Sequence, residues 1–157
     1  MVKSKMEGHR IMEDIERAFK EKVSDHIKIM SEGEHRYRVF TPFMFADGDH
    51  FSIILKREDG GWMLSDEGHT LMHLSFGRNE IDSATQRGGA ITNALTKLGV
   101  LEIPREFIIR IVDERYGDAL YNLVQSLLKV ASVFAGFRDH EEIDRKNFSC
   151  LRGMREK

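Results

Sequence analysis

The chain has 157 residues, a formal net charge of −2 and charged side chains at 32% of its positions. This length and composition are typical of one globular domain with its own core. The balanced charge gives no electrostatic footprint for nucleic acid, although folding could still gather basic side chains on one face. The single cysteine excludes an intramolecular disulfide and a zinc site built from cysteines. We expect a cytoplasmic protein without a signal peptide or a membrane-spanning segment.

Apolar residues recur every four positions near the N-terminus, and glutamate and lysine fill most of the positions between them. This spacing predicts an amphipathic helix over about residues 9–22. A short apolar stretch at residues 27–30 predicts a strand. The four residues with the helical spacing are Ile11, Ile15, Phe19 and Val23.

In residues 36–43 and in residues 51–56, every second side chain belongs to one set and the side chains between them to another, a period of two. The period predicts two strands that each bury one face. Pro42 lacks a backbone N–H, so the first strand ends there or lies at a sheet edge. The Asp-Gly-Gly turn at residues 59–61 predicts a hairpin that leads into a third strand at residues 62–64.

The second half of the chain continues the pattern of sheet and helix. A helix is predicted to begin near Ser83 and to end at Gly99, and a second pair of strands flanks Pro104. Residues 118–135 carry a wide apolar stripe that predicts the longest helix, which Gly136 is expected to end. We therefore predict an α+β fold, an antiparallel sheet of four to six strands with helices packed on one face. Residues 1–136 would form a single domain, and residues 137–157 a charged C-terminal tail.

Three motifs of the central stretch resemble a known family. They are a Thr-Pro-Phe at residues 41–43, an acidic turn at residues 47–49 and a Leu-Ser-Asp-Glu-Gly-His-Thr run at residues 64–70. Together with Gly99-Val100 and a leucine/glutamine run at residues 123–128, they resemble the prokaryotic family catalogued as domain of unknown function 1828. The resemblance covers about residues 39–134. The resemblance implies a single domain and a role connected with mobile elements or defence. It implies no established activity.

The acidic turns offer the residue types of a metal-dependent nuclease or another hydrolase. Carboxylates bind Mg²⁺, and a lysine can lie near the attacking water. In a meander the two turns can lie at the same end of the sheet. The restriction-type spacing fails, however, because Ile54 stands two positions before Lys56, and turn and cap roles explain the acids. The candidate catalytic residues of this alternative are Asp47, Asp49, Lys56, Asp66 and Glu67.

Two histidines raise the question of a metal site. His69 and His73 are four positions apart and share one face of a predicted helix that Asp66 is placed to cap. With Asp66 they could offer three ligands to a divalent metal. We expect no metal and no cofactor, because a polar role in the first turn explains His69 and an exposed position explains His73.

A third alternative is a nucleic-acid-binding domain. Basic and aromatic side chains that alternate along strands can build a sheet face for a single strand. The nearby acidic turns would repel phosphates, and the aromatic residues are more readily explained as core or rim. The residues concerned are Arg36, Tyr37, Arg38, Lys56, Arg57 and Trp62.

The function we prefer is a non-enzymatic interaction module that binds a protein partner or itself. The wide apolar stripe of the 118–135 helix covers more surface than one sheet contact requires. We therefore expect Leu123, Val130 and Val133 to form an exposed flank that is buried in a two-fold homodimer. The N-terminal helix or the tail could instead cover this flank within one chain.

Overall fold

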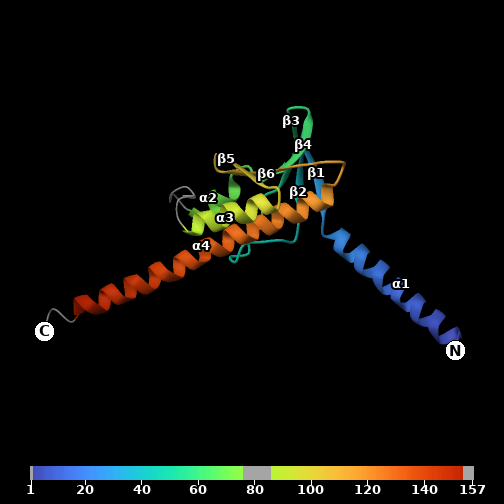
Figure 1. Ribbon diagram of the computed structural model, residues 1–157, viewed down its shortest axis with the longest axis horizontal. Coiled ribbons are helices and arrows are strands. Elements are labelled where there is room, and N and C mark those ends of the chain that lie inside the picture. Colours follow the sequence, from blue (N-terminus) through green and yellow to red (C-terminus); the bar gives the residue numbers. More distant parts are fainter. Residues whose placement is uncertain (1, 76–85, 154–157) are drawn as a thin grey trace.

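The computed structural model describes the backbone of residues 2–75 and 86–153, and the side chains of residues 3–74 and 88–135. Helices and strands follow one another in the order shown in Figure 1. The start predicted near Ser83 for the third helix lies outside the described residues. The elements are α1 (Val2–Asp25), β1 (Lys28–Gly33), β2 (Arg36–Phe40), β3 (Ile54–Glu58), β4 (Gly61–Ser65), α2 (His69–Ser75), α3 (Gln86–Lys97), β5 (Leu101–Ile103), β6 (Glu106–Arg110) and α4 (Tyr116–Gly153).

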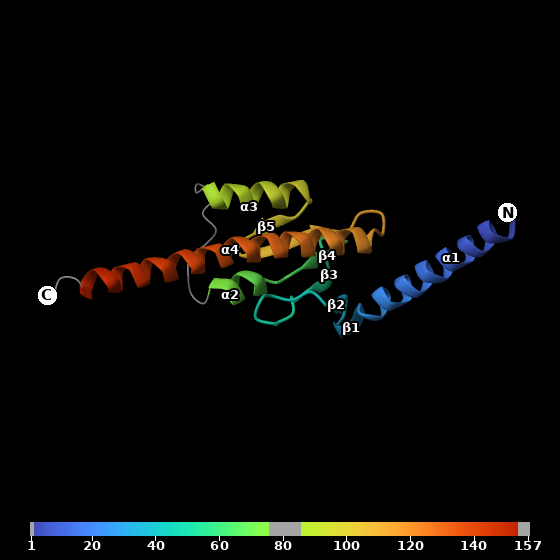
Figure 2. The ribbon, with the colours of Figure 1, turned by 90° about the horizontal axis from the view of Figure 1, so that it is seen from below.

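The strands form one antiparallel six-stranded sheet in the order β1-β2-β3-β4-β6-β5. Helix α4 crosses one face of this sheet and lies between α2 and α3 (Figure 2). The predicted α+β fold, with an antiparallel sheet of four to six strands and helices on one face, is confirmed. Strand β2 ends at Phe40, two residues before Pro42, as the missing N–H of that proline requires.

The two faces of the sheet differ because successive side chains of a strand point to opposite sides. The register aligns Tyr37 with Leu55, and Leu55 with Leu64, on the face that meets α4. The neighbouring positions Arg36 and Lys56 point to the other face. The fully buried members of the core between α4 and the sheet are Ile53, Phe107, Leu123, Leu127 and Val130.

The expectation of an exposed flank at Leu123, Val130 and Val133 is wrong. Leu123 and Val130 are completely buried within one chain, and Val133 packs, partly buried, against the same core. Helices α2 and α3 contact α4 from both sides, so the wide stripe is covered without a second chain. The stripe is wide because three elements pack on it rather than one.

Helix α4 does not end at Gly136 but continues to Gly153, so the predicted boundary at residues 136/137 falls inside one helix. A glycine inside a helix costs only about 1 kcal/mol relative to alanine, which a helix of this length tolerates. At the other end of the chain, α1 is longer than the predicted 9–22 segment and projects away from the sheet (Figure 1). No described helix is long and apolar enough to cross a bilayer.

Candidate functional site

The acidic corner between β4 and α2 is built around the carboxylate of Asp66, which is fully buried. Its Oδ1 accepts hydrogen bonds from the backbone N–H groups of Gly68 at 3.0 Å and Phe107 at 2.8 Å. Its Oδ2 accepts from the N–H of Thr70 at 3.2 Å. Burial raises the pKa of Asp66, and the hydrogen bonds from these donors oppose that rise without cancelling it. The carboxylate caps α2, as predicted, and also binds this helix to β6.

The Asp-x-Gly-x-Thr spacing of the motif follows from this geometry. Gly68 has a φ of +77°, a conformation that residues with a Cβ rarely adopt. A Cβ at this position would lie 3.1 Å from the backbone carbonyl oxygen of Arg105. Asp66 supplies the acceptor, Gly68 the turn and the close approach, and Thr70 the third N–H donor. The motif therefore has a structural role in this chain.

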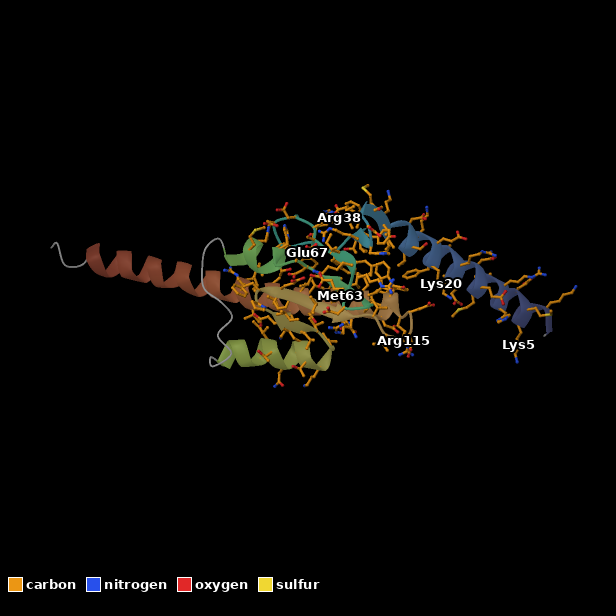
Figure 3. The ribbon with its side chains drawn as sticks, turned by 90° about the horizontal axis from the view of Figure 1, so that it is seen from above. Lys5, Lys20, Arg38, Met63, Glu67 and Arg115 are labelled. Carbon is orange, nitrogen blue, oxygen red and sulfur yellow. The ribbon has the colours of Figure 1, made fainter. Side chains whose placement is uncertain are left out.

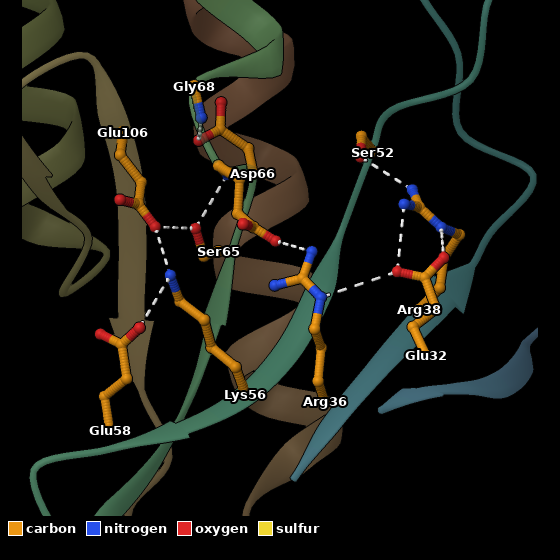
Figure 4. A network of polar contacts seen from close by, with 11 residues as sticks. Glu32, Arg36, Arg38, Ser52, Lys56, Glu58, Ser65, Asp66, Gly68 and Glu106 are labelled. Carbon is orange, nitrogen blue, oxygen red and sulfur yellow. Dashed lines mark hydrogen bonds and ion pairs between the residues drawn. The ribbon is translucent and has the colours of Figure 1, made fainter. Parts of the chain in front are cut away.

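Lys56 lies between two carboxylates on the face of the sheet opposite α4, which we call the open face (Figure 4). Its Nζ lies 2.8 Å from Oε1 of Glu106 and 3.3 Å from Oε1 of Glu58. The hydroxyl of Ser65 also donates to Glu106. Burial acts to raise the pKa of Glu106, but the hydrogen bonds from Lys56 and Ser65 outweigh it and lower that pKa. Burial likewise acts to lower the pKa of Lys56, and its pairing with Glu106 raises it.

Glu67 lies beside this network and pairs with Arg36. Arg36 is also 3.8 Å from Glu32, and Glu32 is paired with Arg38. These pairs form a continuous layer over the open face, in which opposite charges alternate (Figure 4). Because Asp66 bonds to backbone groups while Glu67 and Lys56 pair elsewhere, the structure does not bring these three candidates together around one reacting atom.

Asp47 and Asp49 meet His73 of α2 at a different place. Nε2 of His73 is 2.7 Å from Oδ2 of Asp47, and its Nδ1 is 3.6 Å from Oδ2 of Asp49. The ring of His73 stacks on Phe45, with centroids 4.1 Å apart. The Asp49 N–H, with a smaller contribution from His73, holds the pKa of Asp47 below its usual range. The turn at residues 47–49 is thus a neighbour of α2 through His73.

These three side chains could offer one ligand atom each to a metal, with all three atoms within 4.8 Å of one another. The set differs from the predicted one, because the carboxylate of Asp66 is occupied by backbone donors. His69 does share a face of α2 with His73, and their ring centroids are 5.9 Å apart. Both aspartates are exposed, with 57% and 72% of their side-chain surface accessible. The hydrogen bond between His73 and Asp47 joins the loop at residues 46–49 to α2 and gives these residues a structural role without a metal.

Most of the basic residues of the central strands lie on the face opposite the aromatic ones. Arg36, Arg38 and Lys56 lie in the charged layer, and each contacts a carboxylate. Tyr37 and Trp62 lie on the opposite side of the sheet with ring centroids 6.0 Å apart. The alternation of a strand separates these two sets. Arg57 of the same group lies opposite Trp62 in the register of β3 and β4 and therefore shares the aromatic side.

A surface of another kind lies at the base of α1. An apolar groove of about 710 Å³ opens where the end of α1 and strand β1 approach the start of α4. Phe19 and Val23 of α1 and Ile29 of β1 form one wall, and Tyr116 and Tyr121 of α4 line it as well. These five residues are between 43% and 71% exposed. We call this the α1 groove.

The apolar side of α1 continues outward from the α1 groove. At about 100° per residue, Ile11, Met12, Ile15, Phe19 and Val23 share one side of the helix, and charged residues occupy most of the other positions. Four of these five side chains are at least 60% exposed, and Val23 is 45% exposed. Figure 3 shows the side chains of α1, Lys5 and Lys20 among them, extending from a helix that stands clear of the body. We call these five residues the α1 stripe.

Sequence reasoning identified the α1 stripe as the apolar side of a helix, and offered its burial within the chain only as an alternative to self-association. Its exposure depends on the direction in which the chain leaves β1, and no local pattern specifies that direction. Tyr116, Tyr121 and Glu106 were missed as site residues. They gain their roles from contacts with segments more than 40 positions away, such as Lys56 with Glu106.

No curated protein and no solved structure is detectably similar to this chain. A family model matches residues 41–130, which include the acidic turn, the Asp66 corner and the first part of α4. Helix α1 lies outside this match. The match agrees with the motifs at residues 41–43 and 64–70, and the chain belongs to the family described as domain of unknown function DUF1828.

Proposed function

We propose that this chain is a non-enzymatic interaction module that binds a protein through the α1 stripe and the α1 groove. The observation that carries the proposal is the exposure of the stripe, in which Phe19 is 71% accessible. An isolated amphipathic helix is marginally stable in water, and helices in proteins gain most of their stability by packing an apolar face. A contiguous apolar surface of this kind usually marks an interface.

The charge pattern supports a protein partner over a nucleic acid. The net charge is −2, and Arg36, Arg38 and Lys56 on the open sheet face are paired with carboxylates. The proposal concerns this chain rather than its whole family, because α1 lies outside residues 41–130. The structural role of Asp66 and the pairing of Lys56 argue against the alternative of a hydrolase that uses the acidic corner.

Photo-cross-linking in the producing cells tests the proposal. A photoreactive phenylalanine analogue replaces Phe19 in one variant and Arg17, on the charged side of α1, in the matched control. We expect adducts with a protein from position 19 and few from position 17. Equal yields from both positions, or no adduct from either, would refute a binding role for the stripe.

A further inference from the structure

We propose that the partner of the α1 stripe is a second copy of this chain, and that two α1 helices pair antiparallel about a two-fold axis near Phe19. The inference rests on the proposed function and names the occupant of that surface. Each copy carries both an apolar stripe and an apolar groove, and Phe19 and Val23 belong to both. A two-fold contact uses the same patch on both copies, so a surface of this kind can be self-complementary.

The size of the contact requires the α1 groove to take part. The α1 stripe runs from Ile11 to Val23, a length of about 20 Å at a width of about 10 Å, so it offers roughly 200 Å². Each partner of a stable complex usually contributes about 800 Å². Two helices that touch along their stripes alone would therefore form too small an interface. The groove supplies adjoining apolar surface at the base of the same helix.

The spacing of the stripe matches the groove when Phe19 lies on the axis. In this register Ile15 lies opposite Val23 of the second copy, and Ile11 lies beyond the end of that copy's α1, near its Ile27. Phe19, Val23 and Ile27 all line the groove. The outer part of each stripe thus packs into the groove of the other copy, and Ile11 and Ile15, at 60% and 61% exposure, lose contact with water.

The charges beside the stripe favour the antiparallel direction. In the proposed register Lys20 lies near Glu16 of the second copy, and Lys22 lies near Asp14. Glu16 and Lys20 already lie on the same edge of α1, where they form an ion pair within one helix. A parallel pair would instead place Glu13 beside Asp14 of the other copy. Like charges at such an edge destabilise a helix pair and oppose that arrangement.

Solution mass provides the first arm of the test. The monomer mass is 18.2 kDa, and light scattering at micromolar concentration should give twice this value for the wild type. Phe19→Asp should raise the dissociation constant at least about 100-fold, because it places a charge at the centre of the contact. Arg17→Asp, on the opposite side of the helix, should remain a dimer. Circular dichroism checks that both variants keep their fold.

Disulfide trapping provides the second arm of the test and reports whether the two α1 helices run antiparallel or parallel. In a Cys150→Ser background, a mixture of Ile15→Cys and Val23→Cys chains should form mixed dimers, whereas Ile11→Cys chains should not link to each other. Efficient linking of Ile11→Cys to itself would indicate a parallel pair and overturn the proposal. A wild type that stays monomeric at every concentration would also overturn it. In that case, adducts from position 19 to another protein would still support the proposed interaction module. The absence of such adducts would refute both the interaction module and the homodimer.

Discussion

Asp66 and Phe107 are joined by two hydrogen bonds. The backbone N–H of Asp66 donates to the carbonyl oxygen of Phe107 over 3.1 Å, and the N–H of Phe107 donates to the Asp66 carboxylate over 2.8 Å. This reciprocal contact joins the end of β4 to β6 at the point where α2 begins. A residue with the appearance of a catalytic acid in the sequence is therefore part of the scaffold.

Asp66→Ala should lower the free energy of unfolding by about 3 kcal/mol. The change removes the acceptor for three backbone N–H groups, and each unsatisfied buried donor costs about 1–3 kcal/mol. Urea unfolding at pH 7 measures the loss. A variant as stable as the wild type, or more stable, would contradict the structural role, since catalytic carboxylates are often held at a cost in stability.

Asp66→Asn is the matched control for this prediction. Its amide oxygen can replace Oδ1, which accepts from Gly68 and Phe107, but its NH₂ group would face the N–H of Thr70. We expect a loss of about 1 kcal/mol, between the wild type and Asp66→Ala. An Asn variant that loses as much as the Ala variant would show that charge, rather than hydrogen bonding, stabilises the corner.

Glu106→Gln should make stability less dependent on pH on the acid side. The folded state lowers the pKa of Glu106 from its ordinary value of 4.5, because the hydrogen bonds from Lys56 and Ser65 outweigh burial. The folded protein then binds fewer protons here than the unfolded chain, so this stabilisation is present above 4.5 and is lost as the pH falls through the lowered value. Unfolding curves should show the wild type more stable by about 1 kcal/mol at pH 7, and the difference should vanish well below pH 4.5.

Glu58→Gln provides the comparison for Glu106. Glu58 also contacts Lys56, at 3.3 Å, but 54% of its side chain is exposed. Pairs with so exposed a partner contribute little, so this variant should differ from the wild type by less than about 0.5 kcal/mol at any pH. If both variants had the same effect, the partly buried hydrogen bonds of Glu106 would not be the source of its stabilisation.

Ile29→Asp should weaken self-association about tenfold, and Met30→Asp should leave it unchanged. The two residues are adjacent on β1 and similarly exposed, at 62% and 57%. They point to opposite sides of the sheet, and Ile29 is the one that lines the α1 groove. A tenfold change corresponds to about 1.4 kcal/mol, less than an apolar side chain contributes when fully buried. Sedimentation over a range of concentrations compares the dissociation constants, and equal effects of the two changes would exclude the groove from the contact.

The chain should bind no transition metal tightly. Asp47, Asp49 and His73 offer three ligand atoms, but both aspartates are exposed, and His73 already bonds to Asp47. Structural zinc sites usually have four protein ligands. Elemental analysis of protein purified without a histidine tag provides the check. Near-stoichiometric zinc that is lost in His73→Gln would contradict the prediction and revive the alternative of a metal-dependent hydrolase.

Local patterns in the sequence predicted most of the fold. The period of two in β2 and β3, the Asp-Gly-Gly turn and Gly99 fix elements through the conformations of neighbouring residues, and the structure contains these elements. The end predicted for α4 was wrong, because a glycine inside a helix costs only about 1 kcal/mol, and α4 continues past Gly136 to Gly153. The predicted exposure of Leu123 and Val130 was also wrong, because their coverage by α2 and α3 depends on tertiary packing. The α1 groove escaped prediction for the same reason.

Hydrogen exchange along α1 tests the central claim most directly. A helix that packs against nothing opens easily, and its amides exchange almost as fast as those of an unfolded chain. If a second copy covers the α1 stripe, the amides of residues 11–23 should be protected at least about 100-fold at high protein concentration, and dilution should progressively remove this protection. Fast exchange of these amides at every concentration, or protection that dilution does not change, would contradict the account.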